Sequence, residues 1–158
     1  MKWKKWKPYV ISVGISLGIG ILSGLLSMGG MMMYDLFAIK PGLTPPSWVF
    51  PVVWSVLYVL MGISAAIIWL EKDSAERRRG LNLYVAQLIV NFFWSLIFFN
   101  AQAYGFAVLW LILLWVLVLL MILQFRKVNE LAAKLQIPYL IWLTFAAYLN
   151  IGVWVLNM

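Results

Sequence analysis

Residues Ala103–Phe125 read AYGFAVLWLILLWVLVLLMILQF, with no Lys, Arg, Asp or Glu among them. A helix needs about 20 mostly apolar residues to cross a bilayer. A buried strand is far shorter, so the length of this run indicates a membrane-spanning helix. Four more runs of comparable length are also free of charge: Tyr9–Met28, Val49–Leu70, Leu81–Phe99 and Ile137–Met158. The sequence therefore predicts an all-α membrane protein, a bundle of five transmembrane helices.

The segments between these runs are short, which favours a single domain over residues 1–158. We expect a lid loop over residues 29–48 and a tight link over residues 100–102. That link forces the third and fourth spans into an antiparallel hairpin. The first run follows a lysine-rich start, as in a signal peptide. It has no A-x-A cleavage site, so it is expected to remain as a helix.

The composition excludes several kinds of chemistry. The chain is 65% hydrophobic and 11% charged, whereas a soluble domain is about a quarter charged. It has no Cys and no His, which rules out disulfides, thiol nucleophiles, thiolate metal sites and histidine acid/base catalysis. We therefore expect no metal site and no required cofactor.

The net charge of +7 is unevenly distributed between the two ends of the predicted spans. Eleven basic residues flank the spans on one side, and Lys40 alone lies on the other. This pattern indicates membrane orientation and no nucleic-acid partner, and it predicts a cytoplasmic N-terminus and an external C-terminus. Because the lysine-rich start lacks a cleavable or transit signal, we expect a bacterial plasma membrane.

Polar and aromatic residues recur at steps of three and four within three of the spans, which places them on single helix faces. Span three carries Tyr84, Gln87, Asn91, Trp94, Ser95 and Phe98, span five carries Tyr139, Trp142, Ala146, Asn150 and Trp154, and span two carries Trp54 and Tyr58. Such faces either bind neighbouring helices or line a ligand site. Span one instead carries Gly14, Gly18, Gly20 and Gly24, which favour close packing within the bundle or between subunits.

No charged residue lies inside a predicted span, which argues against ion-coupled transport. A neutral cavity lined by aromatic rings and amides would suit a large, flat, mostly apolar ligand. On the outer side the only charged residues are Asp35 and Lys40, which could form a salt link or contact a ligand.

Three blocks of the chain resemble the translocator protein / tryptophan-rich sensory protein family (TspO/MBR, or peripheral benzodiazepine receptor family). They read KPGLTPPSWVFPVVWSVLYVLMG at residues 40–62, YVAQLIVNFFWSLIFF at residues 84–99 and PYLIWLTFAAYLN at residues 138–150. The sequence departs from the family pattern at Met33 and Leu43, where tryptophan is usual. The cholesterol-recognition pattern is incomplete after Asn150, so cholesterol binding is not carried over.

The resemblance implies a five-helix bundle that forms homodimers and binds porphyrins or other tetrapyrroles under its first loop. The matching ligand-binding positions are Tyr34, Pro45, Trp54, Gln87, Asn91, Trp94, Ser95, Trp142 and Ala146. It implies a sensory or regulatory role. The alternatives are light-dependent porphyrin breakdown involving Trp54 and Trp142, transport of porphyrins or lipids, and a scaffold that works through its helix faces.

Prolines divide the stretch before span two into two parts. Pro41, Pro45 and Pro46 fix φ and disfavour helix in the residues before them, which predicts a stiff, extended lid. Ser47 is expected to cap span two. Trp48 is expected at the membrane interface, with Trp54 nearly two turns deeper.

Overall fold

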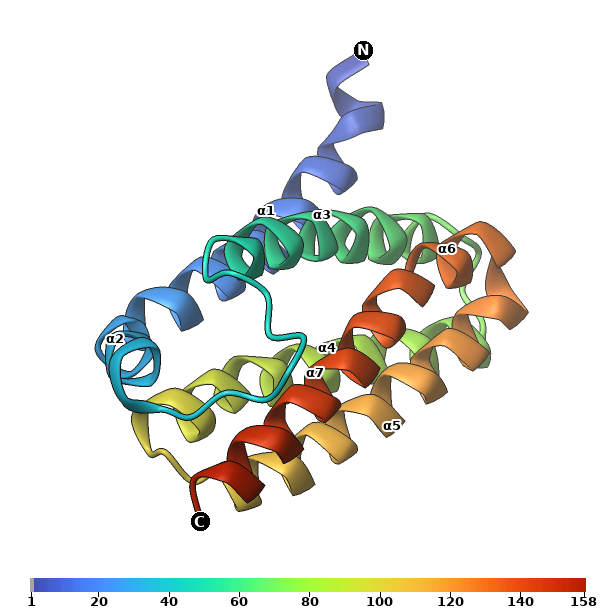
Figure 1. Ribbon diagram of the computed structural model, residues 1–158. Coiled ribbons are helices and arrows are strands. Elements are labelled where there is room, and N and C mark those ends of the chain that lie inside the picture. Colours follow the sequence, from blue (N-terminus) through green and yellow to red (C-terminus); the bar gives the residue numbers. More distant parts are fainter. Residues whose placement is uncertain (1) are drawn as a thin grey trace.

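The computed structural model describes residues 2–158, which form helices and connecting loops without any strand (Figure 1). Five helical stretches of this part of the chain are long and apolar enough to cross a membrane. The prediction of an all-α bundle with five spans is confirmed. The helices are α1 Lys2–Leu26, α2 Met28–Phe37, α3 Val49–Trp69, α4 Ala75–Ser95, α5 Tyr104–Val128, α6 Glu130–Leu135 and α7 Ile137–Leu156, with a π-helix, η1, at Leu96–Asn100.

The core lies among α3, α4, α5 and α7, where Met61, Val118, Met121 and Leu143 are fully buried. The helices α4 and α5 pack side by side along their length, as the short link between them predicts. What holds the bundle together is therefore close packing, supplemented by the hydrogen bonds described below.

The helix α1 packs mainly on α3, and its N-terminal end projects beyond the rest of the bundle (Figure 1). Gly62 admits this contact, because a Cβ there would lie 2.5 Å from the Cα of Val13. The hydroxyl of Ser16 donates to the Tyr58 carbonyl at 2.7 Å. Of the four span-one glycines, Gly20 alone packs closely, against the Tyr58 ring; Gly14, Gly18 and Gly24 have nothing within 4 Å.

Charged connections gather at one end of the bundle. The side-chain amide of Asn129, between α5 and α6, donates to the Glu71 carboxylate, between α3 and α4, at 2.9 Å. At the opposite end, Asn100 donates to the Leu26 carbonyl at 2.8 Å. The ion pairs within residues 73–79 lie at the same end as Glu71 and Asn129. Which end of the bundle faces the cytoplasm stays a prediction.

The expectation of a lid loop over residues 29–48 is wrong in its first half, which forms α2. Methionine and leucine favour helix, and Gly30 allows this helix to pack closely against η1. At Gly30 a Cβ would lie 2.5 Å from the backbone of Phe99. Residues 38–48 remain outside any helix, and we call them the lid segment.

Candidate functional site

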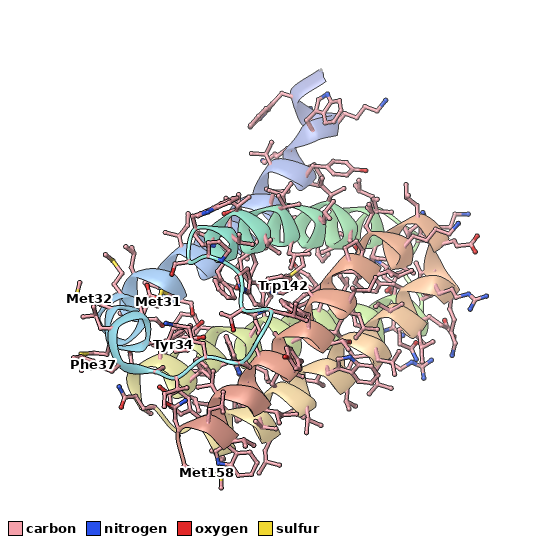
Figure 2. All side chains as sticks on the ribbon, in the orientation of Figure 1. Met31, Met32, Tyr34, Phe37, Trp142 and Met158 are labelled. Atoms are coloured by element: carbon pink, nitrogen blue, oxygen red, sulfur yellow. The ribbon has the colours of Figure 1, made fainter. Side chains whose placement is uncertain are left out.

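A cavity of about 820 Å³ lies beneath the lid segment. Its volume is within the range of small-molecule sites. The walls come from α1, α3, α4, η1 and α7, and α2 and the lid segment cover it. Figure 2 shows Tyr34 and Met31 on the inner side of α2, and Met32 and Phe37 on its outer side. In the same view Trp142 points from α7 into the space between the helices. Eight of the nine predicted ligand-binding residues line this cavity: Tyr34, Pro45, Trp54, Asn91, Trp94, Ser95, Trp142 and Ala146.

Aromatic rings form two groups on the cavity wall. In the first, Trp54 lies 5.6 Å from Tyr58 and 6.5 Å from Trp142, measured between ring centroids, and the two indoles are nearly perpendicular. In the second, the Trp94 ring stacks on Phe98 at 5.0 Å. Such offset and edge-to-face pairs hold each ring in a defined orientation. The cavity therefore offers flat apolar faces whose positions are fixed before any ligand arrives.

A chain of hydrogen bonds runs from the cavity wall into the core. The Tyr58 hydroxyl donates to Asn91 Oδ1 at 2.6 Å, and Asn91 Nδ2 donates to the Tyr139 hydroxyl at 2.6 Å. Tyr139 in turn donates to Gln87 Oε1 at 2.8 Å. The chain holds the Asn91 amide in a fixed orientation at the wall, with one N–H and one oxygen lone pair still available.

The placement of Gln87 differs from the prediction. It is fully buried, it is not among the described residues that line the cavity, and its amide nitrogen faces Met61 Sδ at 3.9 Å. Gln87 and Asn91 share one face of α4, but Gln87 lies one turn further from the lid. Its geometry matches the helix-binding alternative, and its contribution to the cavity is to support Tyr139.

A second set of hydrogen bonds fixes the indole of Trp94. Trp94 Nε1 donates to Asn150 Oδ1 at 3.2 Å, and Asn150 Nδ2 donates to the Tyr104 carbonyl at 2.9 Å. Trp142 differs, because its Nε1 is buried without a partner among residues 2–158. An unpaired buried donor costs about 1–3 kcal/mol. The orientation of Trp142 thus depends on packing against neighbouring rings, among them Phe50, Trp54 and Phe145.

The lid segment is tied to the last turns of α7. The Asn157 side chain accepts from the Ile39 N–H at 2.9 Å and donates to the Ile39 carbonyl at 2.8 Å. The Tyr148 hydroxyl donates to the Gly42 carbonyl at 2.8 Å. At Gly152 a Cβ would lie 2.6 Å from the Pro41 ring. These contacts hold the lid over the cavity.

The predicted cap at Ser47 and the salt link between Asp35 and Lys40 are both absent from the described structure. Ser47 donates to the Asp35 carboxylate at 3.0 Å instead. Lys40 Nζ donates to the main-chain carbonyl of Asp35 at 3.1 Å and lies 5.0 Å from the centroid of the Tyr34 ring. Burial, followed by the charge of Asp35, raises the pKa of Tyr34 to about 12, so its hydroxyl remains a hydrogen-bond donor at neutral pH.

Sequence reasoning placed several other lining residues outside the site. Tyr58 and Asn150 lay on the faces identified from spacing, so the signal that marks them was present. Phe98 also lay on the face identified in span three, so spacing marked it too, whereas Phe50 at the start of α3 had no such signal. Within residues 2–158 no group of three acidic, Cys or His side chains could hold a metal ion. The lining therefore consists mainly of rings, amides and hydroxyls, with Asp35 and Lys40 as its charged members.

The fold and the cavity define a multi-pass helical membrane protein with a lidded, aromatic, ligand-sized site. The chain belongs to the TspO/MBR family, whose model matches residues 12–155. It is 32% identical to the tryptophan-rich protein TspO of Chlorobaculum tepidum (93% of this chain, 94% of the relative) and 36% identical to the translocator protein of Sus scrofa (93% and 90%). It is 41% identical to protein CrtK of Rhodobacter capsulatus (75% and 74%). Membership supports a membrane sensory, regulatory or transport role, and the bacterial relatives support a bacterial plasma membrane.

Proposed function

We propose that this protein binds a tetrapyrrole in the lidded cavity and serves a sensory or regulatory role in the membrane. The observation that carries the proposal is the wall itself: a cavity of about 820 Å³ beneath the lid segment, lined by the indole rings of Trp54, Trp94 and Trp142. Indole rings stack on conjugated planes, while the Asn91 amide can set the orientation of a polar edge. Homodimer formation, which the family resemblance implies, is part of the proposal.

Titration with protoporphyrin IX in detergent, in the dark, tests the binding. We expect saturable quenching of tryptophan fluorescence, because three indoles line the cavity and would lie close to the bound ligand. Replacing both Trp54 and Trp142 with Phe should weaken binding and reduce the quenching. Replacing the exposed Trp69 with Phe serves as the control, since this residue lies at the charged end of α3, away from the cavity. Unchanged affinity in the double variant would contradict the proposed site.

Light-dependent breakdown of the bound porphyrin is the second candidate, and the pairing of Trp54 with Trp142 favours it. Their ring centroids are 6.5 Å apart and both residues line the cavity, so an excited ligand would lie beside two oxidisable indoles. Illumination of the complex should then give a new absorbing product with the wild-type protein and not with the double Phe variant. Bleaching at the rate of free porphyrin in detergent would exclude this activity.

Movement of the ligand across the membrane is the transport alternative. No charged side chain lies within the predicted spans, so coupling to an ion gradient has no group to act through. Flux of porphyrin into proteoliposomes without a gradient, faster than in protein-free vesicles, would favour passive transport. Binding without added flux would favour a sensory role.

A further inference from the structure

We propose that Lys40 is the recognition site for a carboxylate on the cavity ligand, so that the protein selects planar apolar molecules carrying an acidic arm. The inference rests on the proposed function and narrows its ligand class. It starts from the position of Lys40, which lines the cavity from the lid segment and is half-buried. Lys40 is the one basic residue among the described residues that line the cavity.

The ammonium group of Lys40 has no carboxylate partner among residues 2–158. The ion pairs of this part of the chain all lie within residues 73–79, at the opposite end of the bundle. The one hydrogen bond of Nζ goes to the Asp35 carbonyl at 3.1 Å. An ammonium carries three N–H donors, so two remain for another acceptor.

The Tyr34 ring sets the direction of the Lys40 side chain. Nζ lies 5.0 Å from the ring centroid, a distance at which the ring face attracts a cation. Tyr34 itself is buried against Phe98 and Phe99 at 5.5 and 5.4 Å. The ring therefore provides a buried support that holds the ammonium at the edge of the cavity.

Among the described residues that line the cavity, Asp35 is the one acidic residue, and its charge opposes an anionic ligand. Its carboxylate is exposed and accepts the Ser47 hydroxyl at 3.0 Å. Solvent screens an exposed charge more strongly than a half-buried one. The balance of the two charges therefore favours an acidic group that approaches Lys40 from inside the cavity.

A matched pair of ligands isolates this contact: protoporphyrin IX, which has two propionic acid arms, and its dimethyl ester, which has the same ring and no charge. We expect Lys40→Met to weaken binding of the acid by about fivefold, the upper end for a partly solvated ion pair, and to leave binding of the ester unchanged. Ester binding also verifies that the variant folds. Lys72→Met, at the opposite end of the bundle, is the matched control. All titrations use the full chain in a neutral detergent without anionic lipid.

Two further measurements test whether the ligand's acidic arm is attracted to Lys40 by charge. Asp35→Asn keeps an acceptor for Ser47 and removes the opposing charge, so it should strengthen binding of the acid only. Raising the salt concentration should weaken binding of the acid and not of the ester. Equal loss of acid and ester in Lys40→Met, or no loss of either, would overturn the inference. If neither porphyrin binds the wild-type protein, the proposed function itself fails.

Discussion

Replacing Gln87 with leucine should reduce stability and leave ligand binding intact. The change removes the acceptor for the Tyr139 hydroxyl, at 2.8 Å, in a place where both side chains are fully buried. The contact of Gln87 Nε2 with Met61 Sδ, at 3.9 Å, is long and contributes little. Hydrogen bonds between membrane helices contribute about 0.6 kcal/mol on average and at most about 1.7 kcal/mol. We therefore expect the free energy of unfolding to fall by about 0.6–1.7 kcal/mol.

Asn91→Leu is the matched comparison, because Asn91 lies one turn nearer the lid on the same face of α4 and lines the cavity. It removes two hydrogen bonds of 2.6 Å, to Tyr58 and Tyr139, and also a polar group that a ligand can reach. Its loss of stability should be at least as large, and affinity for protoporphyrin IX should fall by up to about tenfold.

Thermal unfolding in detergent and fluorescence titration with protoporphyrin IX measure the two effects separately. For Gln87→Leu we expect a lower Tm and a Kd within about twofold of the wild type. A Kd raised tenfold with an unchanged Tm would refute the placement of Gln87 behind the wall. It would show that the amide reaches the ligand, as the sequence alone predicts.

Three further changes test the packing and the lid. Gly20→Ala should destabilise the protein by about 1–3 kcal/mol through overpacking, whereas Gly18→Ala, with open space at its Cβ, should not; denaturation in detergent compares them. Gly152→Ala should displace Pro41 and speed ligand release in stopped-flow experiments, and unchanged release would argue against a closed lid. The Tyr34 hydroxyl should lose its proton near pH 12, which the difference in absorbance between the wild type and Tyr34→Phe measures. Ionisation of Tyr34 should therefore not weaken ligand binding below pH 10.

Helical periodicity accounts for the parts of the site that the sequence predicts well. Residues spaced by three and four must share a face, so Asn91, Trp94 and Ser95 reach the cavity together with Trp142 and Ala146. Depth along a helix is a different quantity, and periodicity does not encode it. This is why Gln87, which shares the face, lies outside the cavity.

Contacts between segments distant in the sequence could not be predicted from local patterns. Ile39 and Asn157 are hydrogen-bonded although they lie 118 positions apart in the sequence. No motif or spacing near either residue indicates this contact. The helix α2 was missed for a related reason. It packs through Gly30 against the backbone of Phe99, which is distant in the sequence.

The π-helix η1 is a turn that holds one residue more than an α-helical turn, as the hydrogen bond from Ala101 N to Leu96 O shows at 3.0 Å. The wider turn lets two consecutive rings, Phe98 and Phe99, both contact Tyr34. Because η1 ends α4 and is followed by the link to α5, one residue can be lost here without changing the register of α4. When family members are aligned, a gap of a single position is therefore expected here. A relative with that gap would keep the bundle and offer one ring fewer to support the helix above the cavity.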